Sequence, residues 1–229
     1  MNSISELRTD THQEISRLLS SINPTPEQRW REYLGIAPDQ VQLSQDHQQR
    51  LGLTRMFHQL YLENRVLFHM TVTYKMPLRY QYRDHQFNSF FCNFYLKFFL
   101  PSLMGTRNYH TETKRPLQPI CYAFLDQHEL KPVIVELQSG NLVTFPERLH
   151  HHAIVAVHPN TIDRMRHLVG ENAVPLDEKT SSAKWTDRTR CAFKVMTTHI
   201  RECEAMTTLY ATKSLTKYPE FLSFPDRLH

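Results

Sequence analysis

The sequence predicts an α+β domain in which helices flank a central, mainly antiparallel β-sheet, with a helical extension at the N-terminus. Segments rich in β-branched and aromatic residues, which are typical of strands, begin at residue 66 and recur as far as residue 198. Some of them are joined by a short turn and others by segments of helical period, a mixture that indicates an α+β architecture. With 229 residues, the chain is long enough to bury a core without disulfide bonds.

Residues 1–62 form the predicted extension, and residues 63–229 form the predicted main domain. Apolar residues at helical spacing predict helices over residues 3–19 and 44–63, and Pro26 marks the start of another helix between them. No glycine-rich loop or cluster of reactive side chains stands out in this part. We therefore expect it to be an accessory helical region.

From residue 66 onward, strand and helix signals follow one another along the chain. They predict strands over residues 66–74, 119–126, 132–138, 142–145, 149–157 and 191–198, and helices over residues 85–105, 160–170 and 200–217. A turn at residues 139–141 would join two of the short strands into a hairpin. Gly105 would end the first helix, and Pro219 would stop the last one, which we expect at the end of the chain.

The composition narrows the class of protein. The four cysteines are scattered with no Cys-x-x-Cys pair, which excludes zinc-ribbon spacing and favours a reducing, cytoplasmic location. No apolar run reaches the roughly 20 residues of a membrane helix, and the polar N-terminus is unlike a secretory signal, so we expect no membrane partner. A net charge of +4 and a pI of about 8.9 are compatible with a nucleic-acid partner without establishing one.

Three consecutive histidines begin the strand at residues 149–157. Because side chains alternate between the faces of a strand, His150 and His152 project together and His151 projects to the other side. Two imidazoles at this spacing can share one metal ion, with further ligands from a neighbouring strand or water. The alternative is a set of solvated histidines at the end of a strand.

The last predicted helix carries a second group of reactive side chains. Tyr210, Lys213 and Lys217 are spaced by three and four residues, so they would share one helix face. A tyrosine can attack phosphorus when a nearby cation stabilises the developing charge, and a lysine one turn away could supply that cation. The alternative is an ordinary amphipathic helix with Tyr210 packed in the core.

Together with the strand "FHMTVTY", these motifs resemble those of the HUH endonuclease superfamily, in particular the rolling-circle replication initiator (Rep) proteins of plasmids and phages. The family's first motif is matched by residues 68–74, its His-hydrophobe-His motif by His150 and His152, and its Tyr-x-x-Lys helix by Tyr210 and Lys213. The resemblance covers roughly residues 66–217. Each motif is short, and their order and structural context make the match specific.

Two positions depart from the family pattern. His151 stands where the family normally has a bulky apolar residue, at a position that is not a metal ligand. Ser214 occupies the place of the second tyrosine found in some initiators. The resemblance therefore implies a single catalytic tyrosine and one covalent attachment per site.

The resemblance also implies a third metal ligand from another strand, and two carboxylates fit this role. Glu136 closes the strand at residues 132–136 and is close enough in sequence for that strand to pair directly with the histidine strand. Asp126 ends the preceding strand and is the better choice if residues 131–146 form an inserted hairpin. The sequence leaves both possibilities open.

The function implied by the resemblance is site-specific nicking of single-stranded DNA to initiate rolling-circle replication. The histidines and one carboxylate would hold Mg²⁺ or Mn²⁺, Tyr210 would form a 5′-phosphotyrosine, and Lys213 would neutralise the phosphate. The expected partners are single-stranded or origin hairpin DNA, with a host helicase and polymerase. A transposase or mobilisation relaxase of the same superfamily, and a non-catalytic DNA-binding module, are the alternatives.

Contacts to DNA would come from cations and aromatic rings in one basic segment and from the terminal helix. Aromatic rings stack on unpaired bases, and cations pair with phosphates. The predicted DNA-binding residues are Lys75, Arg79, Tyr80, Tyr82, Arg83 and Lys217. A solvated basic loop is the alternative for the segment between Lys75 and Arg83.

Overall fold

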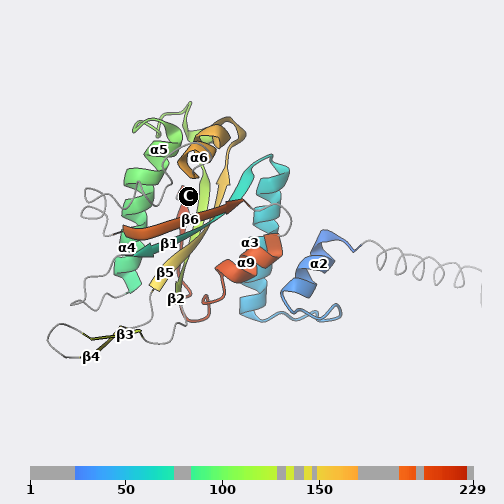
Figure 1. The fold of residues 1–229 in the computed structure, drawn as a ribbon. Coiled ribbons are helices and arrows are strands. Elements are labelled where there is room, and N and C mark those ends of the chain that lie inside the picture. Colours follow the sequence, from blue (N-terminus) through green and yellow to red (C-terminus); the bar gives the residue numbers. More distant parts are fainter. Residues whose placement is uncertain are drawn as a thin grey trace, which may run out of the picture.

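A five-stranded antiparallel sheet forms the centre of the computed structural model (Figure 1). The structure describes residues 24–74, 84–127, 133–136, 142–145, 149–169, 191–199 and 204–225. The strand order is β6-β1-β5-β2-β7, so the histidine strand β5 is the central one. The strands are β1 (Val66–Tyr74), β2 (Ile120–Gln127), β5 (Leu149–Val157), β6 (Cys191–His199) and β7 (Phe221–Phe224). This architecture confirms the predicted α+β class.

A separate two-stranded hairpin is inserted between β2 and β5. It consists of β3 (Val133–Glu136) and β4 (Leu142–Phe145), which pair only with each other among the described residues. The hairpin was predicted from the turn residues between its strands. Because β3 pairs with β4 and not with β5, β2 is the strand that lies beside the histidines.

One face of the sheet is covered by a long helical segment and a second, shorter helix. The segment consists of α4 (Asp84–Phe94), the π-helical turn η1 (Tyr95–Phe99) and α5 (Leu100–Met104), and it ends at Gly105, whose φ of 65° suits glycine. Its buried aromatic side chains pack on β1, β2 and β5 together with α6 (Ile162–Val169), which follows the short turn η3 (Pro159–Thr161). The predicted helices in these two regions are confirmed.

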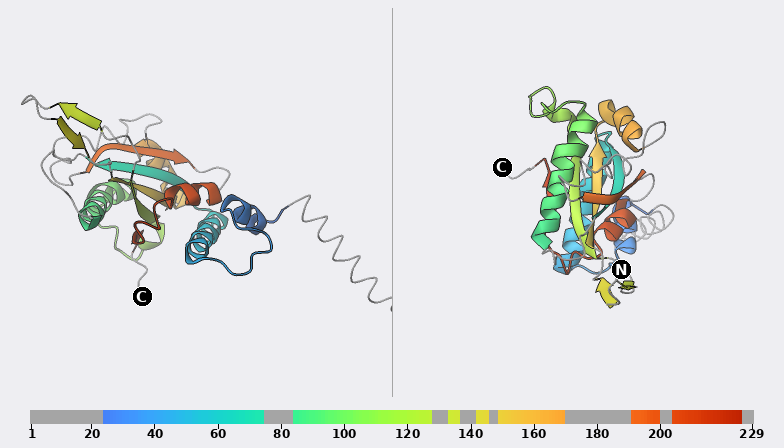
Figure 2. Two further views of the ribbon diagram at one scale, coloured as in Figure 1. Left: turned by 90° about the horizontal axis from the view of Figure 1, so that it is seen from below. Right: turned by 60° about the vertical axis from the view of Figure 1, so that its left-hand side comes forward.

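The opposite face carries α3 (Gln45–Leu62) and α9 (Glu204–Ala211), and Figure 2 shows the α4–α5 segment and α9 on opposite sides of the strands. Phe57 of α3 packs with Ile154 of β5 and with Leu215, just beyond α9. The short helix α2 (Pro26–Tyr33) contributes Trp30 to a cluster that includes Ala205 of α9. The described part of the predicted N-terminal extension therefore packs against the sheet and α9.

The C-terminal region differs from the prediction. Helix α9 ends at Ala211, turns follow over residues 212–217, and the chain then adds β7 to the edge of the sheet beside β2. The strand β7 could not be predicted from the sequence, because its four residues are too few to show a periodic pattern. The helix predicted over residues 3–19 lies outside the described residues.

Within the described ranges, no helix has the length and apolar character needed to cross a membrane.

Candidate metal centre

Three buried side chains that can bind a metal ion meet on the α9 face of the sheet. His150 and His152 lie on β5, and Asp126 is the direct partner of His150 on β2. Register places all three on the same face, because directly paired residues of an antiparallel sheet project to the same side. The predicted strand parity of the two histidines is confirmed, and the structure brings Asp126 to them.

The three ligand atoms form a compact triangle. His150 Nε2 and His152 Nε2 are 3.0 Å apart, and they lie 3.2 and 3.0 Å from Asp126 Oδ2. Adjacent ligands of an octahedral ion with bonds of about 2.1 Å would be about 3.0 Å apart. We call these three residues the triad, and its edges match one face of such a coordination sphere.

A ring of further contacts orients the triad. Thr71 Oγ1 lies 3.2 Å from His152 Nδ1, and Thr71 is the residue of β1 that pairs directly with His152. When Nδ1 carries the proton and donates it to Thr71, the lone pair of Nε2 faces the triad. Ser214 donates its hydroxyl to Asp126 Oδ1, and Lys213 Nζ lies 2.8 Å from Oδ2. These partners orient the His152 ring and the Asp126 carboxylate.

The protonation states of Asp126 and His152 favour the binding of a cation. Burial raises the pKa of Asp126, but the two imidazoles, the Lys213 ammonium and the Ser214 hydroxyl outweigh burial and hold that pKa well below its usual range. Burial is also the largest influence on His152 and lowers its pKa. At neutral pH the site therefore presents an ionised carboxylate beside an imidazole that resists protonation.

The donor set fits a divalent metal ion. Asp126 Oδ2 is buried and has no well-aligned hydrogen bond, although three nitrogen atoms lie within 3.2 Å of it. Two imidazole nitrogens and a carboxylate oxygen that converge within 3.2 Å of one another are ligand atoms that one divalent cation can bind together. Nitrogen and oxygen ligands in this ratio suit several first-row metals as well as Mg²⁺, so the residues indicate a divalent site without selecting the ion.

Tyr210 stands beside the triad at the end of α9. Its ring centroid is 4.7 Å from that of His152, and Lys213 Nζ lies 4.8 Å from the Tyr210 ring centroid. Ala205 and Ala211 of the same helix are buried in hydrophobic clusters, whereas Tyr210 is half exposed. The alternative of an ordinary amphipathic helix with Tyr210 packed in the core therefore does not describe the structure.

Lys213 lies in the turn after α9, and the turn rather than a longer helix brings its ammonium to Asp126. Lys217, further along the same turn, is exposed and has its Nζ 5.5 Å from the Tyr218 ring centroid. The expected common helix face of Tyr210, Lys213 and Lys217 is thus replaced by a helix end followed by a turn. Of the two lysines, it is Lys213 whose ammonium contacts the triad.

Three site residues could not be assigned these roles from the sequence. The sequence indicates Ser214 only as the replacement of a second tyrosine, and Thr71 only as part of a strand motif. His69 of β1 lies on the same face as Thr71 and contacts the rings of both His152 and Tyr210. The sequence signal that could indicate His69 is its position two residues before Thr71, because residues at this spacing share one face of a strand.

His151 projects to the other face, as predicted. It is buried, contacts the Tyr74 hydroxyl through Nδ1, and has Nε2 3.0 Å from Asn88 Oδ1 on α4. Burial, with smaller contributions from the neighbouring charged forms of His150 and His152, lowers its pKa to about 3. A neutral, hydrogen-bonded imidazole therefore fills the slot that the family pattern assigns to an apolar residue.

Several predicted site residues lie beyond what the structure describes. The basic segment with Lys75, Arg79, Tyr80, Tyr82 and Arg83 lies outside the described residues. The backbone of Glu136 is part of β3, but its side chain is also outside the described set. Their assigned roles in DNA or metal binding remain predictions.

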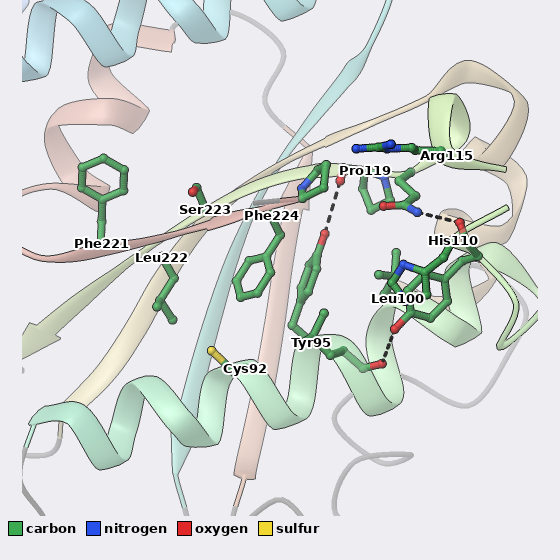
Figure 3. Close-up of a pocket in the computed structure, with 14 residues that line it drawn as sticks. Cys92, Tyr95, Leu100, His110, Arg115, Pro119, Phe221, Leu222, Ser223 and Phe224 are labelled. Carbon is green, nitrogen blue, oxygen red and sulfur yellow. Dashed lines mark hydrogen bonds between the residues drawn. The ribbon is translucent and has the colours of Figure 1, made fainter. Parts of the chain in front are cut away.

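A cavity of about 680 Å³ lies on the opposite face of the sheet, between η1 and the edge strand β7 (Figure 3). Tyr95 and Phe224 stack within its wall, and Arg115 and His110 also line it. None of the triad residues lines it. The cavity is therefore separate from the candidate metal centre.

No protein-family model, curated protein or solved structure matches this chain. The structure itself shows an antiparallel sheet that carries a buried His-x-His pair and an aspartate in an arrangement able to bind a metal ion.

Proposed function

We propose that the chain is a metal-dependent endonuclease of the HUH superfamily that nicks single-stranded DNA through Tyr210 and thereby initiates rolling-circle replication. One observation carries this proposal: the half-exposed Tyr210 ring stands 4.7 Å from the ring of the triad residue His152. A hydroxyl nucleophile beside a buried divalent site is the arrangement that tyrosine-dependent phosphoryl transfer requires. The order of the three sequence motifs gives independent support.

The proposed step transfers a phosphoryl group without net hydrolysis. The Tyr210 oxygen forms a bond to phosphorus, and the bond between phosphorus and the 3′ oxygen breaks. The phenolic proton passes to water, and the departing oxygen takes a proton from water, which leaves a 5′-phosphotyrosine and a free 3′-hydroxyl. Because the phosphotyrosine retains the energy of the diester, a later attack by a DNA 3′-hydroxyl reseals the strand without ATP.

The residues around Tyr210 divide the remaining tasks. Asp126, His150 and His152 would hold the ion, which when bound polarises the scissile phosphate as a Lewis acid. Lys213 contacts Asp126 in the structure, and its Nζ also lies over the Tyr210 ring. In this position its charge can offset the negative charge that develops as Tyr210 attacks.

The expected substrate is single-stranded or hairpin origin DNA, and the free 3′-hydroxyl would prime synthesis by a host polymerase with a host helicase. A transposase or relaxase would share the cleavage step. These two differ from an initiator in the fate of the 3′-hydroxyl, which an initiator leaves for a polymerase to extend. A DNA-binding module would bind the strand and form no adduct.

The test is covalent capture of DNA by the full-length chain. Incubation with a random-sequence single-stranded DNA pool and Mn²⁺ should give an adduct that survives SDS, and EDTA should prevent it. Tyr210→Phe should abolish the adduct while non-covalent DNA binding persists. Tyr61→Phe is a matched control, because Tyr61 and Tyr210 are 54% and 53% exposed and Tyr61 stacks on His58 in α3.

Sequencing the captured strand would identify the target, and extension of its 3′ end by a polymerase would favour replication over transposition. If the wild type captures no DNA from the pool with either Mn²⁺ or Mg²⁺, the endonuclease proposal is wrong. An adduct that persists in Tyr210→Phe and disappears in Tyr61→Phe would likewise contradict it.

A further inference from the structure

His69 contains a buried polar atom that the site described so far does not use. The residue lies on the triad face of β1, and its register partner on β5 is Ile154, two residues from His152. Its Nε2 is buried and has no hydrogen-bond partner among the described residues. Buried polar groups are nearly always paired in folded proteins, so this atom indicates a partner that arrives with a ligand.

The surroundings of His69 show where that ligand would lie. The ring centroid of His69 is 5.0 Å from that of His152 and 5.5 Å from that of Tyr210. The contact with Tyr210 is T-shaped, at 74° between the ring planes, and such ring contacts are much weaker than a conventional hydrogen bond. His69 thus adjoins both a triad imidazole and the proposed nucleophile.

The chemistry of His69 limits what it can bind. An imidazole ring carries at least one N–H donor whether it is neutral or protonated. Of the groups brought to this site by the proposed reaction, the negatively charged oxygen atoms of the phosphodiester are the strongest acceptors for such a donor.

We propose that His69 Nε2–H donates a hydrogen bond to a phosphate oxygen of the substrate bound at the triad, which makes His69 a further catalytic residue. This inference rests on the proposed function. A donor held in place before the reaction stabilises the charge that develops on phosphate oxygen without any need to reorganise. The unpartnered nitrogen of the free protein is then the pre-formed half of a substrate contact.

Two substitutions separate the hydrogen bond from ring packing. His69→Phe keeps an aromatic ring against Tyr210 and His152 but removes the donor. His69→Gln removes the ring and retains an amide N–H at a distance from the backbone similar to that of Nε2. Both variants should keep the Mn²⁺ affinity and the melting temperature of the wild type, because His69 is not part of the triad.

The experiment measures phosphate binding as well as cleavage. In Mn²⁺-loaded protein, binding of dimethyl phosphate is followed by the paramagnetic relaxation of its ³¹P signal. His69→Phe should weaken this binding, and slow formation of the Tyr210 adduct, by about 10- to 100-fold. His69→Gln should recover most of both losses.

The result that overturns the inference is a His69→Phe protein that equals the wild type, or a His69→Gln protein no better than His69→Phe. A loss of Mn²⁺ affinity in both variants would also overturn it, since His69 would then be a ligand of the ion. Dimethyl phosphate binding needs no strand cleavage. If the wild type forms no adduct, the endonuclease proposal fails while the phosphate measurement still decides the role of His69.

Discussion

Adjacent histidines on the two faces of β5 have different kinds of partner. On the α9 face, His150 and His152 direct their Nε2 atoms toward each other and toward Asp126. On the α4 face, His151 is equally buried, but its two nitrogens contact a tyrosine hydroxyl and an amide oxygen. One face thus gathers three potential ligand atoms that a cation can bind, whereas the other pairs its imidazole with neutral hydrogen-bonding groups.

This difference shows that burial alone does not make a histidine a candidate metal ligand. All three imidazoles are nearly inaccessible to solvent. The triad acquires its character from the ionised Asp126 on β2, while the position beside His151 on β2 is occupied by Leu125. The residue on the neighbouring strand decides what each histidine can do.

The largest expected effect concerns the metal itself. Mn²⁺ at 100 times its Kd should stabilise the wild type by about 2.7 kcal/mol, because the ion binds only the folded state. His152→Ala should remove this stabilisation, since it deletes one of three ligands. Thermal unfolding with and without Mn²⁺ measures both effects.

His151→Ala is the matched control for this change, because it truncates the adjacent histidine on the other face. It should lower the melting temperature in the absence of metal but retain the increase caused by Mn²⁺. If His151→Ala and His152→Ala lose the Mn²⁺-induced rise in melting temperature equally, the two faces of β5 do not differ in metal binding.

A smaller effect is expected from the partner that orients His152. Thr71→Val keeps the size of the side chain but removes the hydroxyl beside His152 Nδ1. Substitutions of such outer partners typically lower metal affinity by about 10- to 100-fold. Titration with Mn²⁺, monitored by the EPR signal of the free ion, gives the affinity. Thr54→Val, at a buried threonine whose hydroxyl donates to the Arg50 carbonyl within α3, is the comparison variant, and an equal loss there would show that Thr71 has no special role.

The smallest effect is a change in acid stability on the α4 face. The pKa of His151 is about 3 in the folded protein and 6.5 in its ordinary state. Below pH 6.5 the unfolded chain binds a proton that the folded chain does not, so stability is fully present above pH 6.5 and falls as the pH drops toward 3. Urea unfolding of metal-free His151→Phe should show a shallower decline over this window. A decline as steep as that of the wild type would mean that other groups cause it.

The strands and their parity could be predicted because they depend on local patterns. Alternation of β-branched and aromatic residues identified β1, and the same alternation separated His151 from its two neighbours. The strand β7 could not be predicted in this way, because a four-residue segment at a sheet edge carries little periodic signal. The position of α9 depends on Trp30 and Phe57, which lie far from it in the sequence.

By itself, the sequence determined the α+β class and the two histidines that share a face, since each follows from the period of a strand or helix. Only the tertiary structure decided that Asp126 lies beside the two histidines and that His69 adjoins Tyr210. It also decided that Ser214 contacts the Asp126 carboxylate, from which it is separated by 88 residues in the sequence. The physical reason is that strand order and register bring these residues together. No local pattern encodes which distant strand will become a neighbour.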